Sequence, residues 1–302
     1  MSQHVAVLMG GWSAEREVSL VSGAAAGAAL RERGYRVFEI DVGRDLPQRL
    51  AELRPDVVYN ALHGRFGEDG TVQGLLEIMA IPYTHSGVLA SSLAMNKAMA
   101  KRLFASAGLR SPEGHLTTID ALRNGEPPMI PPYVIKPNNE GSSVGVRIVW
   151  TADERTIDRN DWPFGPEVLV ERYVPGRELT VAVLGDRPLT VTEIRPRQGF
   201  YDYHAKYTDE AAEHLVPAPI SEALYRRAMA DARTAHRVLG CRGVSRADFR
   251  LDESDPDGLY LLEVNTQPGM TPLSLVPEQA AHVGIGFADL VVQLVEAARC
   301  DT

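Results

Sequence analysis

The chain has 302 residues, a length that allows two or three hydrophobic cores. Its 31 lysines and arginines are outnumbered by 40 aspartates and glutamates, and the resulting charge of −9 opposes binding to a phosphate backbone, so no nucleic-acid partner is expected. The sequence shows no signal peptide, no apolar run of about eighteen residues and no cysteine pair with metal-ligand spacing, so we expect a cytoplasmic protein without a membrane partner.

In the first third of the chain, short apolar strands alternate with helices. Strands are expected at residues 5–9, 35–42 and 56–62, and helices at residues 14–33, 46–53 and 72–79. This order predicts parallel strands joined by right-handed crossovers, and therefore a Rossmann-like, doubly wound α/β domain. The first turn reads Gly10-Gly11-Trp12-Ser13 rather than G-x-G-x-x-G, so neither a dinucleotide site nor a dehydrogenase is expected.

Two glycine-rich turns follow the first and third strands. The first is Gly10-Gly11-Trp12-Ser13, and the second, residues 62–70, contains His63 and three glycines. Because ligands of open α/β sheets bind beyond the carboxyl ends of the strands, both turns are placed where they could bind a carboxylate or a phosphate. Glycines required only for backbone geometry explain the same residues equally well, so both interpretations stay open.

A single long helix at residues 88–107 is expected to end the first domain, and strands at 133–137 and 167–171 follow. The loop between these strands, residues 138–145, carries glycines and serines whose backbone amides can wrap phosphates, although it lacks the P-loop pattern. Lys136 ends an apolar strand and therefore needs a buried or anionic partner.

The last part of the chain is predicted to contain a β-hairpin with an acidic face. Two β-rich runs surround Gly185-Asp186, a polar loop at 195–214 has the length of a lid, and helices are expected at 221–239 and 287–299. The hairpin lies between these helices, with its turn at 253–258.

Alternate residues of a strand share a face, which predicts where the hairpin side chains point. Glu263 and Asn265 project together, while Leu262 and Val264 point to the opposite face. If the two strands pair, Asp248 joins Glu263 and Asn265 as a third hard oxygen ligand, a set that suits Mg²⁺. An ordinary amphipathic hairpin with a solvated polar face is the alternative for either strand alone.

Taken together, these segments resemble the D-alanine:D-alanine ligase family of the ATP-grasp superfamily over nearly the whole chain. The resemblance is carried by GGWSAEREVS (10–19), LHG (62–64), KPNNEGSSVG (136–145), YDYHAKY (201–207) and LLEVNTQPGM with TPLSLVP (261–277). It implies a three-domain α/β ATP-grasp ligase, with an N-terminal Rossmann-like substrate domain (1–95), a central ATP-grasp subdomain (96–178) and a C-terminal ATP-grasp domain (179–302) that bears the lid loop and the metal-binding hairpin.

The resemblance also implies the reaction and its partners. An enzyme of this family transfers the γ-phosphoryl group of ATP to one D-alanine, and the amine of a second D-alanine attacks the resulting D-alanyl phosphate. The products are D-alanyl-D-alanine for peptidoglycan precursors, ADP and phosphate. The expected partners are therefore ATP, D-alanine and a second copy of the chain in a homodimer.

Residues for the nucleotide and the metal carry over by position. The implied metal ligands are Asp248, Asn265 and Glu263, which bridges two Mg²⁺ ions that Mn²⁺ is able to replace. The implied phosphate-binding lysines are Lys97, Lys136 and Lys206. Adenosine is held by Glu171, the backbone near Tyr173 and Val174, and Glu178, which accepts hydrogen bonds from the ribose. Without the resemblance, Lys97 reads as a solvated helix lysine and 171–178 as a charged strand end.

Substrate residues carry over in the same way. Glu15 receives the ammonium group of the first D-alanine and forms a hydrogen-bonded set with Ser142 and Tyr207. Arg246 and the Gly269 amide form an oxyanion site, and Ser274 with the Leu275 amide holds the carboxylate of the second D-alanine. His63 lies on the substrate side, although a loop histidine is often merely solvated.

Two rival functions differ from this reading in identifiable residues. Another ATP-grasp ligase would share the metal and nucleotide residues, but Glu15, Ser142 and Ser274 favour the D-alanine:D-alanine family. A nucleotide-binding protein without turnover would have lost part of the metal or lid set, all of which is present. Asn96, where many members have aspartate, and Leu273 depart from the commonest pattern without removing an assigned group.

Overall fold

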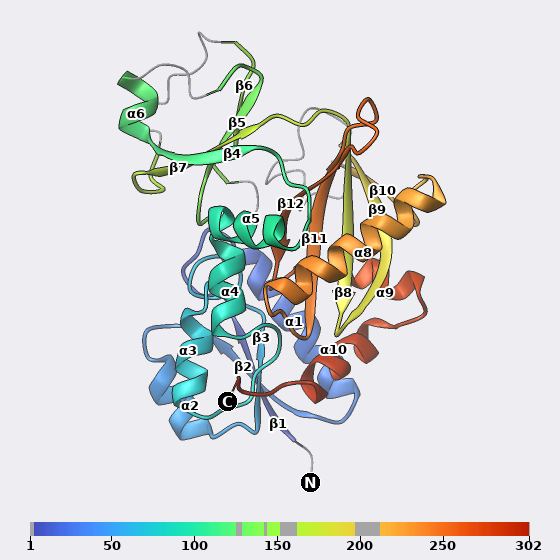
Figure 1. The fold of residues 1–302 in the computed structure, drawn as a ribbon. Coiled ribbons are helices and arrows are strands. Elements are labelled where there is room, and N and C mark those ends of the chain that lie inside the picture. Colours follow the sequence, from blue (N-terminus) through green and yellow to red (C-terminus); the bar gives the residue numbers. More distant parts are fainter. Residues whose placement is uncertain (1–2, 125–128, 142–143, 152–161, 197–211, 302) are drawn as a thin grey trace.

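The computed structural model describes residues 3–124, 129–141, 144–151, 162–196 and 212–301. Three β-sheets divide the molecule: a three-stranded sheet at the bottom of Figure 1, a four-stranded sheet at the top and a five-stranded sheet between them. This mixed α/β architecture confirms the predicted fold class, and Ser142, Lys206 and Tyr207 lie outside the described residues. Among the helices that the structure describes, none is both long and apolar enough to cross a membrane.

The N-terminal sheet is parallel, as the strand and helix alternation predicts. Its order is β2-β1-β3, with Val5 of β1 opposite both Val37 and Val57. Both faces are covered, because Val5 and Val7 pack with the core beneath α1 and α10 while Leu8 packs with that of α2 and α3. The strands are β1 (His4–Met9), β2 (Arg36–Asp41) and β3 (Val57–Asn60), and the helices are α1 (Arg16–Glu32), α2 (Leu46–Leu53) and α3 (Thr71–Ile78).

The predicted single helix at residues 88–107 is wrong: it is two helices, α4 (Val88–Met95) and α5 (Lys97–Ser106). Asn96 interrupts them with an extended backbone, and its side chain caps α5 by accepting a hydrogen bond from the Met99 amide. The Lys97 amide, which a continuous helix would bond internally, donates instead to the Asn138 carbonyl. The break therefore ties the start of α5 to the central sheet.

The central sheet is antiparallel and carries one short helix. Its order is β4-β7-β5-β6, and Ile119 and Leu122 of the helix pack on Tyr133, Ile135 and other strand residues. The elements are β4 (Gly114–Thr118), α6 (Ile119–Asn124), β5 (Tyr133–Pro137), β6 (Arg147–Val149) and β7 (Glu167–Arg172).

The C-terminal sheet is antiparallel, in the order β10-β9-β8-β11-β12. On α8, Ala228, Ala232 and Ala235 form one small-residue face in the same core as Phe249, and Ser221 caps the helix. The elements are β8 (Arg177–Leu184), β9 (Arg187–Pro196), β10 (Ala212–Leu215), α8 (Glu222–Val238), β11 (Val244–Leu251), β12 (Leu259–Asn265), α9 (Leu275–His282) and α10 (Phe287–Glu296).

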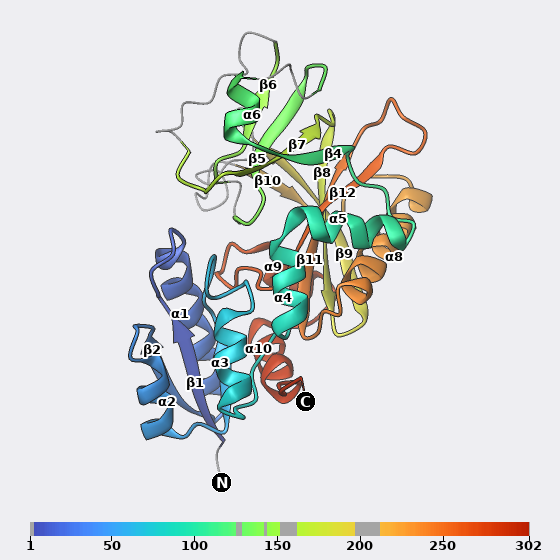
Figure 2. The ribbon, with the colours of Figure 1, turned by 60° about the vertical axis from the view of Figure 1, so that its left-hand side comes forward.

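The last helix returns to the beginning of the chain. In Figure 2, α10 lies beside the N-terminal sheet, and its Leu290 and Leu294 share a core with Val5 and Leu30. The C-terminal residues also lie there, since Arg299 bridges to Tyr83, which in turn pairs with β3. The predicted domain boundary between residues 95 and 96 coincides with the break before α5. The predicted boundary between residues 178 and 179 falls inside β8. The domain limits themselves stay predictions.

Candidate active site

The hairpin of β11 and β12 brings the predicted metal ligands together. Asp248 lies directly opposite Glu263, and Arg246 lies opposite Asn265. The register then shifts, because Phe249 pairs with Leu261, which leaves Leu262 as an extra residue on β12. The prediction that Leu262 points away from Glu263 is wrong for this reason: the bulge puts both side chains in the lining of the same cavity.

Each of the two facing carboxylates contacts a cation of the site. The Arg246 guanidinium donates to both oxygens of Asp248, at 2.8 and 2.7 Å, and Thr180 Oγ1 donates to the same carboxylate at 2.7 Å. Lys97 Nζ lies 3.0 Å from Glu263 Oε2 and donates to the Glu140 carbonyl at 2.6 Å. Lys97 is buried, so its interpretation as a solvated helix lysine is wrong.

The donor set fits a hard divalent cation. Two carboxylates and the amide oxygen of Asn265 offer only oxygen, which Mg²⁺ prefers. Because an ionised carboxylate has about four lone-pair sites, the contacts of Asp248 and Glu263 with Arg246 and Lys97 leave them further coordination capacity. No group of three or more His, Cys, Asp or Glu side chains arranged for a metal occurs among the described residues. A metal held by Asp248, Glu263 and Asn265 would therefore complete its coordination with water or a substrate.

Two adjoining cavities meet at these carboxylates. The first, about 910 Å³ including open solvent, is lined by residues of the N-terminal and C-terminal parts of the chain, and the second, about 840 Å³ including open solvent, by residues of the central and C-terminal sheets. Lys97, Glu178, Asp248 and Glu263 line both. Every predicted site residue that the structure describes lines one of them. In the first cavity these are Glu15, His63, Arg246, Asn265, Gly269, Ser274 and Leu275, and in the second they are Lys136, Glu171, Tyr173 and Val174.

The second cavity contains a carboxylate held between two lysines. Glu171 is buried; its Oε1 lies 2.5 Å from Lys101 Nζ and its Oε2 lies 2.5 Å from Lys136 Nζ. Burial raises the pKa of Glu171, but the charges of Lys136 and Lys101 outweigh it and lower that pKa overall, so the carboxylate is ionised at neutral pH. Glu171 is thus the anionic partner that the position of Lys136 requires. Sequence reasoning missed Lys101, although it follows Lys97 by one helical turn.

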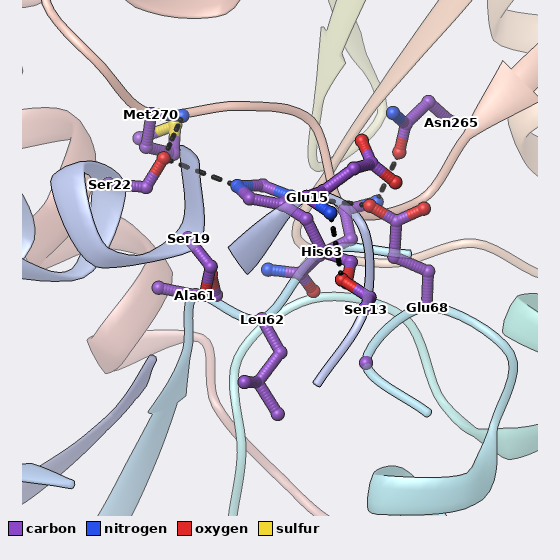
Figure 3. Close-up of polar contacts among 12 residues, drawn as sticks. Ser13, Glu15, Ser19, Ser22, Ala61, Leu62, His63, Glu68, Asn265 and Met270 are labelled. Carbon is purple, nitrogen blue, oxygen red and sulfur yellow. Dashed lines mark hydrogen bonds and ion pairs between the residues drawn. The ribbon is translucent and has the colours of Figure 1, made fainter. Parts of the chain in front are cut away.

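In the first cavity, His63 is buried in a polar cluster rather than solvated (Figure 3). Its Nδ1 lies 3.2 Å from Glu68 Oε1, and its Nε2 lies 3.2 Å from Ser22 Oγ, which accepts a hydrogen bond from the Met270 amide. Burial lowers the pKa of His63, but the hydrogen bond and charge of Glu68 outweigh it and raise that pKa overall. Sequence reasoning missed Glu68, five residues beyond His63, and Ser22.

Glu15 immediately precedes α1 and reaches the same space as Glu68 in Figure 3. Gly10, Gly11 and Gly64 all have positive φ, and a Cβ on Gly64 would lie 2.8 Å from Glu15 Oε2. Backbone geometry and close approach therefore account for these glycines. The binding of a carboxylate or a phosphate at these turns stays a prediction.

The loop after β12 is fixed to the N-terminal sheet. The Gln267 side chain donates to the Asn60 carbonyl, and Asn60 Nδ2 donates back to Gln267 Oε1 at 3.3 Å. Farther along the loop, Ser274 Oγ accepts a hydrogen bond from the Thr271 amide at 2.9 Å, and a Cβ on Gly269 would lie 2.9 Å from that oxygen. These contacts set the path of residues 267–274 along the first cavity.

Comparisons with known proteins agree along the whole chain. A family model for the D-ala D-ala ligase N-terminus matches residues 46–86, and one for the C-terminus matches residues 105–296. The D-alanine–D-alanine ligase of Paramagnetospirillum magneticum is 58% identical over 308 residues, and that of Rhodospirillum rubrum is 56% identical over 305, with 100% of each chain covered in both cases. The crystal structure of D-alanine–D-alanine ligase from Bacillus anthracis complexed with ATP has a TM-score of 0.81 at 31% identity, covering 98% of this chain and 97% of that one. A second structure of that ligase has a TM-score of 0.83 at 32% identity, with the same coverage.

Proposed function

The chain belongs to the family of D-alanine–D-alanine ligases, and on this premise we propose that it joins two D-alanines at the expense of ATP. The reaction proceeds through D-alanyl phosphate and gives D-alanyl-D-alanine for peptidoglycan precursors, ADP and phosphate. The observation that carries the proposal is the meeting of two cavities at Asp248 and Glu263: one is lined by Lys136 and Glu171, the other by Glu15, Gly269 and residues 273–275. A nucleotide in the former would direct its phosphates toward an amino acid in the latter.

The second cavity is assigned to adenosine and its phosphates. Its lining is largely apolar, with Val134, Val144, Val174 and Leu262, which suits a planar base. Glu171 and the backbone at Tyr173 and Val174 are proposed to meet adenine, while Glu178, 3.7 Å from the Arg250 guanidinium, is proposed to accept from the ribose hydroxyls. Lys97 and Lys136, and Lys206 outside the described residues, are assigned to the phosphates. Phosphoryl transfer depends chiefly on such positioning and charge.

Asp248, Glu263 and Asn265 are the residues that would hold two Mg²⁺ ions, or Mn²⁺ in their place. When bound, these ions neutralise the charge that develops on the phosphates. The protein contributes the spacing: β11 and β12 hold Asp248 and Glu263 opposite one another at the point that the two cavities share. Glu140 and Lys97, whose ammonium group donates to the Glu140 carbonyl, also line the cavity at this point.

The first cavity is assigned to the two D-alanines. Glu15 is proposed to bind the ammonium group of the first, with Ser142 and Tyr207, outside the described residues, completing its hydrogen-bonded set. Arg246 and the Gly269 amide are proposed to stabilise the tetrahedral oxyanion. Ser274 and the Leu275 amide, at the start of α9, are proposed to bind the carboxylate of the second D-alanine, because a helix N-terminus attracts an anion.

His63 is proposed to act on the substrate side, with its ring held by Glu68 and Ser22, which it contacts. A raised pKa favours the imidazolium form, which would balance the charge of Glu15 and Glu68. The homodimer and the cytoplasmic location are proposed from the family resemblance.

The experiment that tests this function measures phosphate release from MgATP with D-alanine, with L-alanine and with D-alanine plus D-lactate, and identifies the products by mass. D-alanyl-D-alanine from D-alanine alone is the expected product. Turnover only with another acid and amine would keep the ATP-dependent ligase chemistry and overturn the assignment of the first cavity. Absence of ADP with every amino acid would favour nucleotide binding without turnover.

A further inference from the structure

Lys101 stands behind the proposed nucleotide cavity rather than in it. The described residues that line the cavity include Glu171, Lys136 and Pro112, but not Lys101. Lys101 Nζ donates to Glu171 Oε1 and to the Pro112 carbonyl, each at 2.5 Å. The ammonium group of Lys101 is thus held by two acceptors of the protein itself, the Pro112 carbonyl and the Glu171 carboxylate.

The charges around Glu171 do not balance. One buried carboxylate contacts two ammonium groups, so the cluster carries one positive charge in excess. Lys136 faces the cavity, whereas Lys101 does not, so the excess charge is presented to the cavity by Lys136. Were Lys101 absent, Glu171 would neutralise Lys136, and the cluster would present no net charge to a phosphate.

The use of lysine in this chain supports a specific role for Lys101. Only four of the 31 basic residues are lysines: Lys97, Lys101, Lys136 and Lys206. Three of these are the lysines assigned to phosphates, and arginine serves at every other basic position, including the surface. An ammonium is a compact charge with three donors, whereas a guanidinium is a planar fork, and the compact group here donates to two acceptors 2.5 Å away in a largely buried position.

We propose that Lys101 is a positioning residue for the nucleotide: it neutralises Glu171 from behind, so that Lys136 keeps its charge for a phosphate of ATP. This inference rests on the proposed function, because it takes the second cavity to be the nucleotide site. It makes no claim that Lys101 touches ATP.

The test is a double-substitution cycle read out by MgADP affinity, measured by calorimetry on the full chain. Lys101→Met should weaken MgADP binding by about tenfold or more, because Lys136 would then be neutralised by Glu171 and would lose a charge-assisted hydrogen bond to a phosphate. In a Glu171→Gln background the carboxylate that must be neutralised is gone, so adding Lys101→Met should change the affinity by less than about threefold. Equal losses in both backgrounds would overturn the proposal, since they would mean that Lys101 acts on the fold and not through Glu171.

Arg102→Met provides the matched control, because Arg102 is an exposed basic residue on the same helix whose guanidinium contacts Met99. Arg102→Met removes one positive charge from α5, as Lys101→Met does, and should leave MgADP affinity unchanged. A tenfold loss with Arg102→Met would refute the explanation through Glu171, because it would show that any positive charge on α5 has the same effect. If Lys101→Met fails to fold, Lys101→Gln takes its place in the cycle, because it removes the positive charge and keeps a hydrogen-bond donor beside Glu171; it should show the same tenfold loss, confined to the background that keeps Glu171. Failure of the wild-type chain to bind MgADP would instead refute the proposed function.

Discussion

His85 makes the stability of the chain sensitive to acid. It is 1% exposed, its Nδ1 lies 2.9 Å from Thr84 Oγ1 and 3.3 Å from Gln267 Nε2, and its Nε2 has no hydrogen-bond partner among the described residues. Burial, together with the charges of His63 and Arg242, lowers the pKa of His85 from 6.5 to about 3. The folded chain therefore holds the ring neutral where an unfolded chain would protonate it.

The sign and size of the effect follow from proton linkage. Between pH 6.5 and about 3 the unfolded state binds a proton that the folded state does not, so the free energy of unfolding falls as the pH falls through this window. One unit below the unfolded pKa, at a pH of about 5.5, the loss attributable to His85 is about 1.4 kcal/mol relative to pH 7.5. This is a substantial fraction of the stability of a typical domain.

Urea unfolding followed by tryptophan fluorescence at both pH values, for the wild type and His85→Asn, measures this term. Asparagine is the matched replacement, because the backbone of His85 has a φ of 68°, which asparagine tolerates and most side chains do not. The wild type should lose about 1.4 kcal/mol more than the variant, while other titrating groups cancel in the comparison. Equal losses would show that His85 takes up its proton in the folded chain and would refute the assigned pKa.

Three further outcomes test the site. Glu263→Gln should reduce turnover by more than about a hundredfold and weaken Mn²⁺ binding measured by electron paramagnetic resonance. Loss of a residue that binds the metal directly should cost more than the roughly tenfold to hundredfold typical of a residue that only supports a ligand. Near-normal turnover would contradict the metal assignment. Gln267→Leu should lower the free energy of unfolding in urea by about 1–3 kcal/mol, because it leaves the buried polar groups of Asn60 without their partner; an unchanged urea midpoint would contradict this. MgADP should bind at least about tenfold more tightly than ADP alone in calorimetry. Phosphates without a metal would have to draw Lys97 and Arg246 away from Glu263 and Asp248, which would leave these carboxylates without their cations. Equal affinities would contradict this role of the two ion pairs.

Local sequence patterns were sufficient to predict which strands pair, but not the direction of every side chain on those strands. The strand periodicity placed Asp248 and Glu263 on facing strands because antiparallel pairing follows from a short turn. It failed at Leu262, since a bulge adds one residue and reverses the alternation, and no local signal in the sequence marks it. The break at Asn96 could have been predicted more easily, because asparagine is a common helix cap, but the Lys97 amide that the break releases bonds to Asn138, which lies in the turn after β5.

The site residues that sequence reasoning missed have one feature in common: they act through another residue. Glu68 orders His63 and Lys101 neutralises Glu171, and each contact is defined only once the chain has folded. A motif identifies groups that meet a substrate, since these recur in a fixed order. The supporting residues can be reached from several elements, so tertiary contacts are needed to find them.

Charge pairing within the site explains why so many ionisable groups can be buried together. Arg246 neutralises Asp248, Lys97 neutralises Glu263, and Lys101 with Lys136 holds Glu171. Each pair lowers the cost of removing a charge from water, and each fixes a long side chain before a ligand arrives. When a substrate brings phosphates together with their own cations, the lysines and arginine can pair with the phosphates while the carboxylates pair with the cations. No buried charge is then left without a partner. The same exchange is unavailable to a neutral ligand, so we expect the arrangement to favour a metal-bound polyphosphate, in line with the proposed function.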